Sequence, residues 1–106
     1  MVTNRYGDGW EALADGTRRA IVASLAEGPR AVGQLAMGLP VSRSAVSQHL
    51  KVLKDAGLVE DVAAGTRRIY RLNPAALAAL RDQLDTYWQR ALGAYADAAE
   101  TPAEED

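Results

Sequence analysis

The stretch from residue 40 to residue 60, PVSRSAVSQHLKVLKDAGLVE, concentrates side chains that are suited to hydrogen bonding with another molecule. Val46, Leu50 and Leu53 recur at helical spacing, which predicts a helix with one apolar face turned toward a core. The opposite face carries hydroxyls, an amide and amines, together with one carboxylate: Ser44, Gln48, Lys51 and Asp55, with Ser47 and Lys54 alongside. A helix face that meets only water more often carries Glu–Lys pairs, so this composition favours a binding face.

Short polar side chains allow a helix backbone to approach the bases and phosphates of DNA closely. Gln48 carries the donor and acceptor that adenine requires, and serine accommodates several base edges. Arg43 and Lys51 would neutralise phosphates, and the helix N-terminus, which Ser42 is predicted to cap, also favours an anion. The pattern therefore indicates DNA binding, with a merely solvated polar helix face as the alternative.

His49 is the only histidine of the chain. A lone histidine does not make a zinc site, which takes about four ligands. Helical geometry places His49 at the margin of the apolar stripe. A hydrogen-bonded structural histidine is the first interpretation, and a phosphate contact at the same margin is the second.

A β-hairpin is predicted directly after this helix, with strands at residues 58–62 and 67–72 and a turn at 63–66. Arg67 and Arg68 follow the turn, where an arginine reaches a phosphate strand or a narrow minor groove. Neighbouring strand residues point to opposite faces, so one arginine makes the better contact. Arg68 is favoured over Arg67 and Tyr70, and a charge-protected edge strand is the alternative.

Apolar periodicity and capping residues predict the elements that position these side chains. Helices are expected at residues 8–14, 16–28, 30–39 and 43–56 and from 74 to about 99, with the hairpin at 58–72. This order is that of a mainly α-helical winged helix-turn-helix with an extra helix at each end. One domain is expected over residues 1–96, followed by an acidic, disordered tail at 97–106.

Composition narrows the function further. The chain has 106 residues and no cysteine, which excludes disulfides, thiolate metal sites and cysteine nucleophiles. No apolar run reaches membrane-spanning length and no signal peptide is recognisable, so a soluble, cytoplasmic protein is expected. No glycine-rich phosphate loop or catalytic triad is present, which argues against an enzyme. Residues 1–72 hold ten basic against seven acidic residues, and 73–106 hold two against seven, which suggests a polyanionic partner for the first part.

The segments LADGTRRAIVASLAEGPRAVGQLA, VSRSAVSQHLKVLKDAGLVE and GTRRIYRL resemble the ArsR/SmtB family of bacterial winged-helix repressors. The resemblance covers roughly residues 10–95. It implies a homodimer that binds a pseudo-palindromic operator near a promoter, with the helix after the turn in the major groove and the hairpin as a wing. It assigns DNA contacts to Ser42, Arg43, Ser44, Ser47, Gln48, His49 and Lys51.

The family dimerises through its first and last helices, and the sequence supports such an interface. Its apolar and aromatic residues at both ends exceed what a three-helix core covers: Trp10, Leu13, Leu80, Leu84, Tyr87, Trp88, Leu92 and Tyr95. The alternative is that some of these side chains fold back on their own domain.

Neither metal-site type known from the resemblance is matched here. The helix before the turn has Ala36, Met37 and Gly38 where metal sensors carry cysteines, and the last helix has Asp82 and Asp85 but no histidine. A carboxylate-only cation site is a weaker alternative. The chain is therefore interpreted as a transcriptional repressor without a cofactor, either a non-metal-sensing member of the family or one with no small-molecule effector. A protein-interaction module that does not bind DNA is the rival function.

Overall fold

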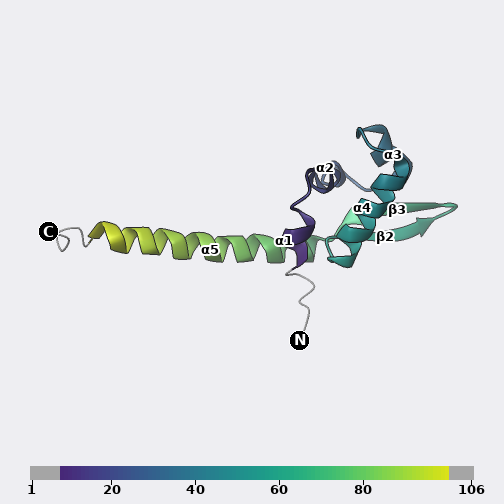
Figure 1. Cartoon of the computed structure of the whole chain (residues 1–106). Coiled ribbons are helices and arrows are strands. Elements are labelled where there is room, and N and C mark those ends of the chain that lie inside the picture. Colours follow the sequence, from purple (N-terminus) through teal and green to yellow (C-terminus); the bar gives the residue numbers. More distant parts are fainter. Residues whose placement is uncertain (1–7, 101–106) are drawn as a thin grey trace, which may run out of the picture.

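The computed structural model describes residues 8–100, and within them four short helices and a three-stranded antiparallel sheet form a body from which the fifth helix extends (Figure 1). The elements in chain order are α1 (Asp8–Ala12), α2 (Gly16–Leu25), β1 (Arg30–Ala31), α3 (Val32–Met37), α4 (Arg43–Asp55), β2 (Val59–Ala64), β3 (Arg67–Leu72) and α5 (Pro74–Glu100). The predicted order of four helices, hairpin and long last helix is confirmed.

The helix starts follow from local capping chemistry. Asp15, Ser42 and Asn73 precede α2, α4 and α5, and their side-chain oxygens accept first-turn backbone N–H groups at 3.0, 3.0 and 3.1 Å. Gly57 ends α4 with a φ of 83°, a left-handed conformation that glycine adopts without a steric penalty. Ser42 takes the capping role that the sequence predicts. The turn before Ser42 and the stop at Gly57 therefore set both ends of the central helix α4.

The sheet has the order β1-β3-β2, so the hairpin gains a third strand that the sequence did not predict. β1 is two residues long and pairs Arg30 with Tyr70 and Ala31 with Ile69, whereas the sequence pattern places both residues in the following helix. The hairpin ladder also continues to the pair Ala64–Arg67, so the loop is Gly65 and Thr66 rather than the expected four residues. Gly65 has a φ of 66°, which a tight two-residue hairpin turn requires.

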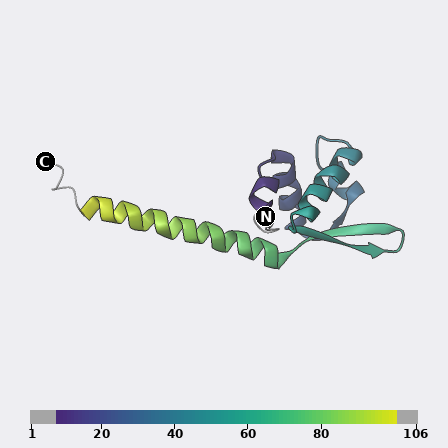
Figure 2. The same cartoon turned by 60° about the horizontal axis from the view of Figure 1, so that its bottom comes forward.

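One apolar core holds the helices and the base of the hairpin together. Its fully buried side chains include Ile21 from α2, Leu35 from α3, Val46, Leu50 and Leu53 from α4, and Leu58 from the segment before β2. Because α4 contributes three of these residues, the position of its opposite face is set by the core. Figure 2 shows α4 among the other short helices and next to the hairpin.

Helix α5 extends far beyond this core. Its 27 residues span about 40 Å at the usual rise per residue. Ala76 and Leu80 in its first turns are buried, and most of the rest runs away from the body as a free rod (Figures 1 and 2). Residues 97–100 belong to this helix, which corrects the predicted start of the tail. The remainder of the predicted tail lies outside the described residues.

Candidate nucleic-acid interface

The exposed face of α4 carries the predicted base-reading residues together. Val46, Leu50 and Leu53 have no exposed surface, whereas Ser42, Arg43, Ser44, Ser47, Gln48 and Lys51 are all exposed. Residues at i, i+3 and i+4 share one side of a helix, so burial of the apolar stripe turns the polar stripe outward. The result is one continuous hydrogen-bonding face, which starts at the hydroxyl of Ser42 that caps the helix.

His49 lies at the edge of this face, half-buried against α2. Its Nδ1 is 3.4 Å from Nη1 of Arg18, whose Nε donates to the carbonyl oxygen of Ala12. This contact fits the first interpretation of His49, a hydrogen-bonded structural residue. The contact with DNA stays a prediction.

Lys51 is held only loosely by its own helix. Its Nζ is 2.9 Å from Oδ2 of Asp55, one turn further along, and both side chains are largely exposed. Exposed pairs of this kind stabilise a helix by less than about 1 kcal/mol. A DNA phosphate could therefore replace this carboxylate at little cost.

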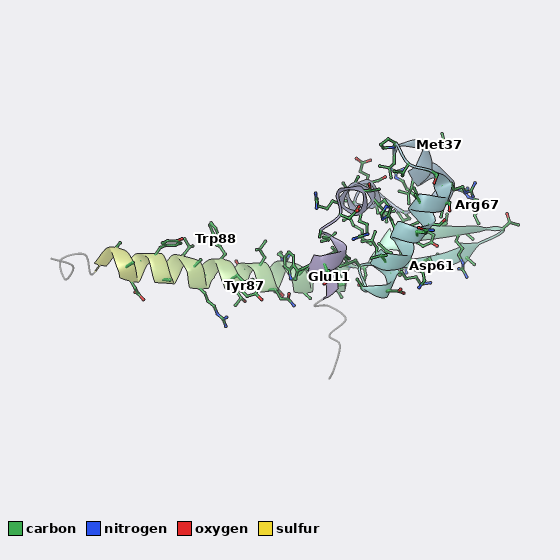
Figure 3. The ribbon with its side chains drawn as sticks, in the orientation of Figure 1. Glu11, Met37, Asp61, Arg67, Tyr87 and Trp88 are labelled. Atoms are coloured by element: carbon green, nitrogen blue, oxygen red, sulfur yellow. The ribbon has the colours of Figure 1, made fainter. Side chains whose placement is uncertain are left out.

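The two wing arginines point to opposite faces of the hairpin, as predicted. Nη2 of Arg67 donates to Oε1 of Gln34 at the start of α3, at 3.2 Å. Nη1 of Arg68 lies 3.2 Å from Oδ2 of Asp61 on β2. Both arginines remain exposed, while Tyr70 is half-buried and packs against the core. Figure 3 shows Asp61 and Arg67 in the winged body.

Two hollows follow the seam between the α3–α4 region and the wing, and Tyr70 lines both. The larger, of about 730 Å³, is bordered by Gln34, Arg43, Arg67 and Arg68. The smaller, of about 300 Å³, is bordered by Ser47, Lys51 and Lys54. Basic side chains border both hollows, and among the described residues Asp55 is the one acidic residue that lines the smaller hollow.

Sequence reasoning missed the ion cluster at the base of the wing. Asp61 lies between Lys54, at 2.7 Å, and Arg68, and the Asp61 side chain is only 6% exposed. The hydrogen bond from Lys54 holds the pKa of the Asp61 carboxyl below its usual 3.8, although burial opposes this shift. Strand alternation carried a usable signal, because Asp61 shares the face of buried Val59.

Seven of the eight predicted dimer residues divide into two groups, and the eighth, Trp10 on α1, is 39% exposed. Leu84, Tyr87, Trp88, Leu92 and Tyr95 are 47–76% exposed along the free part of α5, where Figure 3 shows Tyr87 and Trp88. Leu80 is only 4% exposed and Leu13 packs on the same core. The predicted role of Leu80 in the dimer interface is therefore corrected. Its side chain is buried within its own subunit, because α5 still lies on the core there.

Comparison with known proteins gives matches over helices α2 to α4 and the start of the first wing strand described above. Residues 15–61 match the sequence profile of the family described as "Bacterial regulatory protein, arsR family". HTH-type transcriptional regulator Rv2034 of Mycobacterium tuberculosis is 67% identical over 97 residues, covering 91% of this chain and 91% of that protein. The chain belongs to the ArsR family. It is a transcriptional regulator with a winged helix-turn-helix DNA-binding fold, and not an enzyme.

Two further relatives of this ArsR-family chain are a protein named as a repressor and a homodimeric domain. HTH-type transcriptional repressor SmtB of Mycobacterium tuberculosis is 44% identical over 71 residues, which are 67% of this chain and 53% of that protein. The solution structure of a homodimeric winged helix-turn-helix DNA-binding domain from Mycobacterium bovis, of a possible ArsR-family regulator, superposes with a TM-score of 0.63. It is 35% identical and covers 83% of this chain and 79% of that one.

The metal-site expectations for this ArsR-family regulator concern α3 and α5. Met37 lies on α3, in the segment where metal sensors of the family carry cysteines, and it is 88% exposed. Among residues 8–100, no three His, Cys, Asp or Glu side chains gather in a way that could hold a metal ion. The assignment as a non-metal-sensing member stays a prediction.

In the same part of the chain no helix has the length and apolarity to cross a bilayer.

Proposed function

We propose that this ArsR-family regulator is a sequence-specific repressor that binds a pseudo-palindromic operator as a homodimer. The observation that carries the proposal is the division of α4 into a fully buried stripe of Val46, Leu50 and Leu53 and an exposed stripe of serines, Gln48 and Lys51. A helix anchored in this way presents a rigid polar surface to the major groove, where base edges carry a distinct donor and acceptor pattern.

The side chains divide the work of recognition. Gln48 reads a base edge, with Ser44 and Ser47 beside it, and Arg43 and Lys51 contact phosphates. The wing, with Arg67, Arg68 and the underlying Tyr70, reaches the backbone or the neighbouring minor groove. Ser42 and His49 sit at the two margins of the face, where contacts with phosphates are the expected role.

Dimerisation is supported by the apolar surface on α5. The side chains of Leu84, Tyr87, Trp88, Leu92 and Tyr95 give one isolated subunit an exposed aromatic and aliphatic stripe. Large apolar stripes of this kind mark interfaces in soluble proteins, and one solved relative is a homodimer. Two subunits related by a two-fold axis would then place their α4 helices on half-sites about one helical turn apart, or a multiple of it.

Repression follows if the bound dimer occludes RNA polymerase at a promoter in the cytoplasm. The relative SmtB is named as a transcriptional repressor, which supports repression rather than activation. The protein would act without a metal or cofactor.

The test uses the full chain and the DNA upstream of its own coding region. A mobility shift that weakens steeply between two salt concentrations is expected, together with a footprint of two related half-sites and a dimeric mass in solution. No salt-dependent shift, together with retained binding to another protein, would overturn the proposal in favour of a protein-interaction module.

A further inference from the structure

Asp61 joins three elements of the winged body through one carboxylate. Its Oδ1 accepts from Nζ of Lys54, near the end of α4, at 2.7 Å. Its Oδ2 faces Nη1 of Arg68, on β3, at 3.2 Å. Since Asp61 itself belongs to β2, this cluster ties both wing strands to the recognition helix.

The two cations of the cluster keep most of their donors for another molecule. The carboxylate is 6% exposed, whereas the side chains of Lys54 and Arg68 are 53% and 60% exposed. Lysine has three N–H donors and arginine five, and the cluster uses one from each. Both side chains are therefore anchored at one point and open toward solvent on the binding side.

A carboxylate at this place is costly for a protein that binds a polyanion, because it repels phosphates and cancels one of two positive charges. The nearby Glu60 differs from it, since it forms an exposed pair with Arg71 on the outer face of the hairpin. The doubly paired position of Asp61, whose side chain is 6% exposed, therefore points to a gain in geometry rather than in charge.

We propose that Asp61 is a positioning residue, which sets the wing against α4 and presents Lys54 and Arg68 together to the DNA backbone. The backbone strand that separates the major groove from the adjacent minor groove must pass between a recognition helix and its wing. The hollow lined by Lys51, Lys54 and Tyr70 lies on that path. The inference rests on the proposed DNA-binding function and concerns the contact that holds the wing against α4.

The proposal makes an unusual prediction about the sign of the effect. Asp61→Asn removes a negative charge, so affinity for nonspecific DNA rises several-fold and the salt slope of binding steepens by about one unit. Because the wing is no longer held in register, the ratio of specific to nonspecific affinity falls on the order of tenfold. Asp61→Glu, which keeps the carboxylate, restores most of this ratio.

The matched control is Glu60→Gln, which removes one carboxylate from the same strand without touching the cluster. Both variants are titrated with operator DNA and with unrelated DNA at several salt concentrations. If Asp61→Asn and Glu60→Gln change the affinity ratio equally, the proposal is overturned. Should Asp61→Asn lose its cooperative unfolding transition, Lys54→Met replaces it. Equal losses of specific and nonspecific affinity in Lys54→Met would reduce the cluster to a simple phosphate contact and overturn the proposal, whereas a greater loss of specific affinity supports it.

A measurement without DNA separates this proposal from the proposed function. Backbone order parameters at residues 63–67 of the free protein are expected to fall in Asp61→Asn and to stay unchanged in Glu60→Gln. If the wild-type protein binds no DNA but the two variants differ in this way, the repressor assignment is wrong, and Asp61 is still the residue that positions the hairpin. Unchanged order in both variants would remove the positioning role itself.

Discussion

The indole Nε1 of Trp10 donates a hydrogen bond of 2.7 Å to Oε1 of Gln83, although 73 positions separate the two residues. This bond fastens α1 to α5 at the point where α5 leaves the core. Trp10 is 39% exposed, and one turn beyond Gln83 lie the exposed side chains of Tyr87 and Trp88. The first and last helices therefore form one surface, as a shared dimer interface requires.

Placing charges on this surface should separate the subunits. The double variant Leu84→Asp, Tyr87→Asp is expected to be monomeric in sedimentation experiments, because two carboxylates would be buried in an apolar interface. Both side chains are more than half exposed in the single subunit, so its fold should persist by circular dichroism. Gln89→Asp, on the opposite side of α5, is the control and should remain dimeric. A dimeric double variant would place the interface elsewhere.

Leu80 and Leu92 should respond differently to truncation. Leu80→Ala is expected to lower the free energy of unfolding by about 2–5 kcal/mol, since it opens a cavity in the core of the subunit. Leu92 is 47% exposed in the subunit, so Leu92→Ala should act through dimerisation, and its effect should depend on protein concentration. Urea unfolding at two concentrations distinguishes the two. An effect of Leu80→Ala that vanished in dilute protein would contradict its assignment to the core.

Gln48→Ala should weaken binding to the operator more than any other single change on α4. Loss of a bidentate base contact costs about 1–3 kcal/mol, while affinity for unrelated DNA should change little. Competition titrations with both DNAs measure this difference. Gln89→Ala makes the same chemical change on α5 and should leave both affinities as they are. An unchanged operator preference in Gln48→Ala would argue against direct reading by this residue.

Removal of a wing arginine should lower affinity for every DNA sequence. Arg67→Gln and Arg68→Gln are each expected to lower affinity and to reduce the salt slope by about one unit for each phosphate that is no longer neutralised. We expect the larger decrease in affinity for Arg68→Gln. The control Arg90→Gln removes the same charge from α5. A slope that stayed at the wild-type value in both wing variants would exclude phosphate binding by these side chains.

Acid should weaken the base of the wing. The pKa of Asp61 is held below 3.8 by the hydrogen bond from Lys54, so its ionised form stabilises the folded state. That contribution is complete above the unfolded-state value and is lost as the pH falls through the lower folded-state pKa. Asp61→Asn should therefore show a shallower loss of stability below about pH 4 in thermal unfolding. Parallel loss in the variant and the wild type would contradict the pairing.

Much of helix α4 could be predicted because its determinants are local. Ser42 caps the first turn within three residues of chain, and Gly57 ends the helix by its own backbone conformation. The spacing of Val46, Leu50 and Leu53 then decides which face of α4 is buried and which is open. Local hydrogen bonds and helical periodicity are written directly in the order of residues.

The tertiary structure alone decided the features that depend on distant partners. β1 is a strand only because Arg30 and Ala31 meet β3, since two residues carry no periodicity. Leu80 and Leu84 look alike in the sequence, yet the core ends between them. Asp61 reads as a surface acid until α4 and β3 bring Lys54 and Arg68 to its two oxygens. Sequence pattern determined the helices and their faces, whereas packing between distant segments determined which charges and apolar side chains were left for a partner.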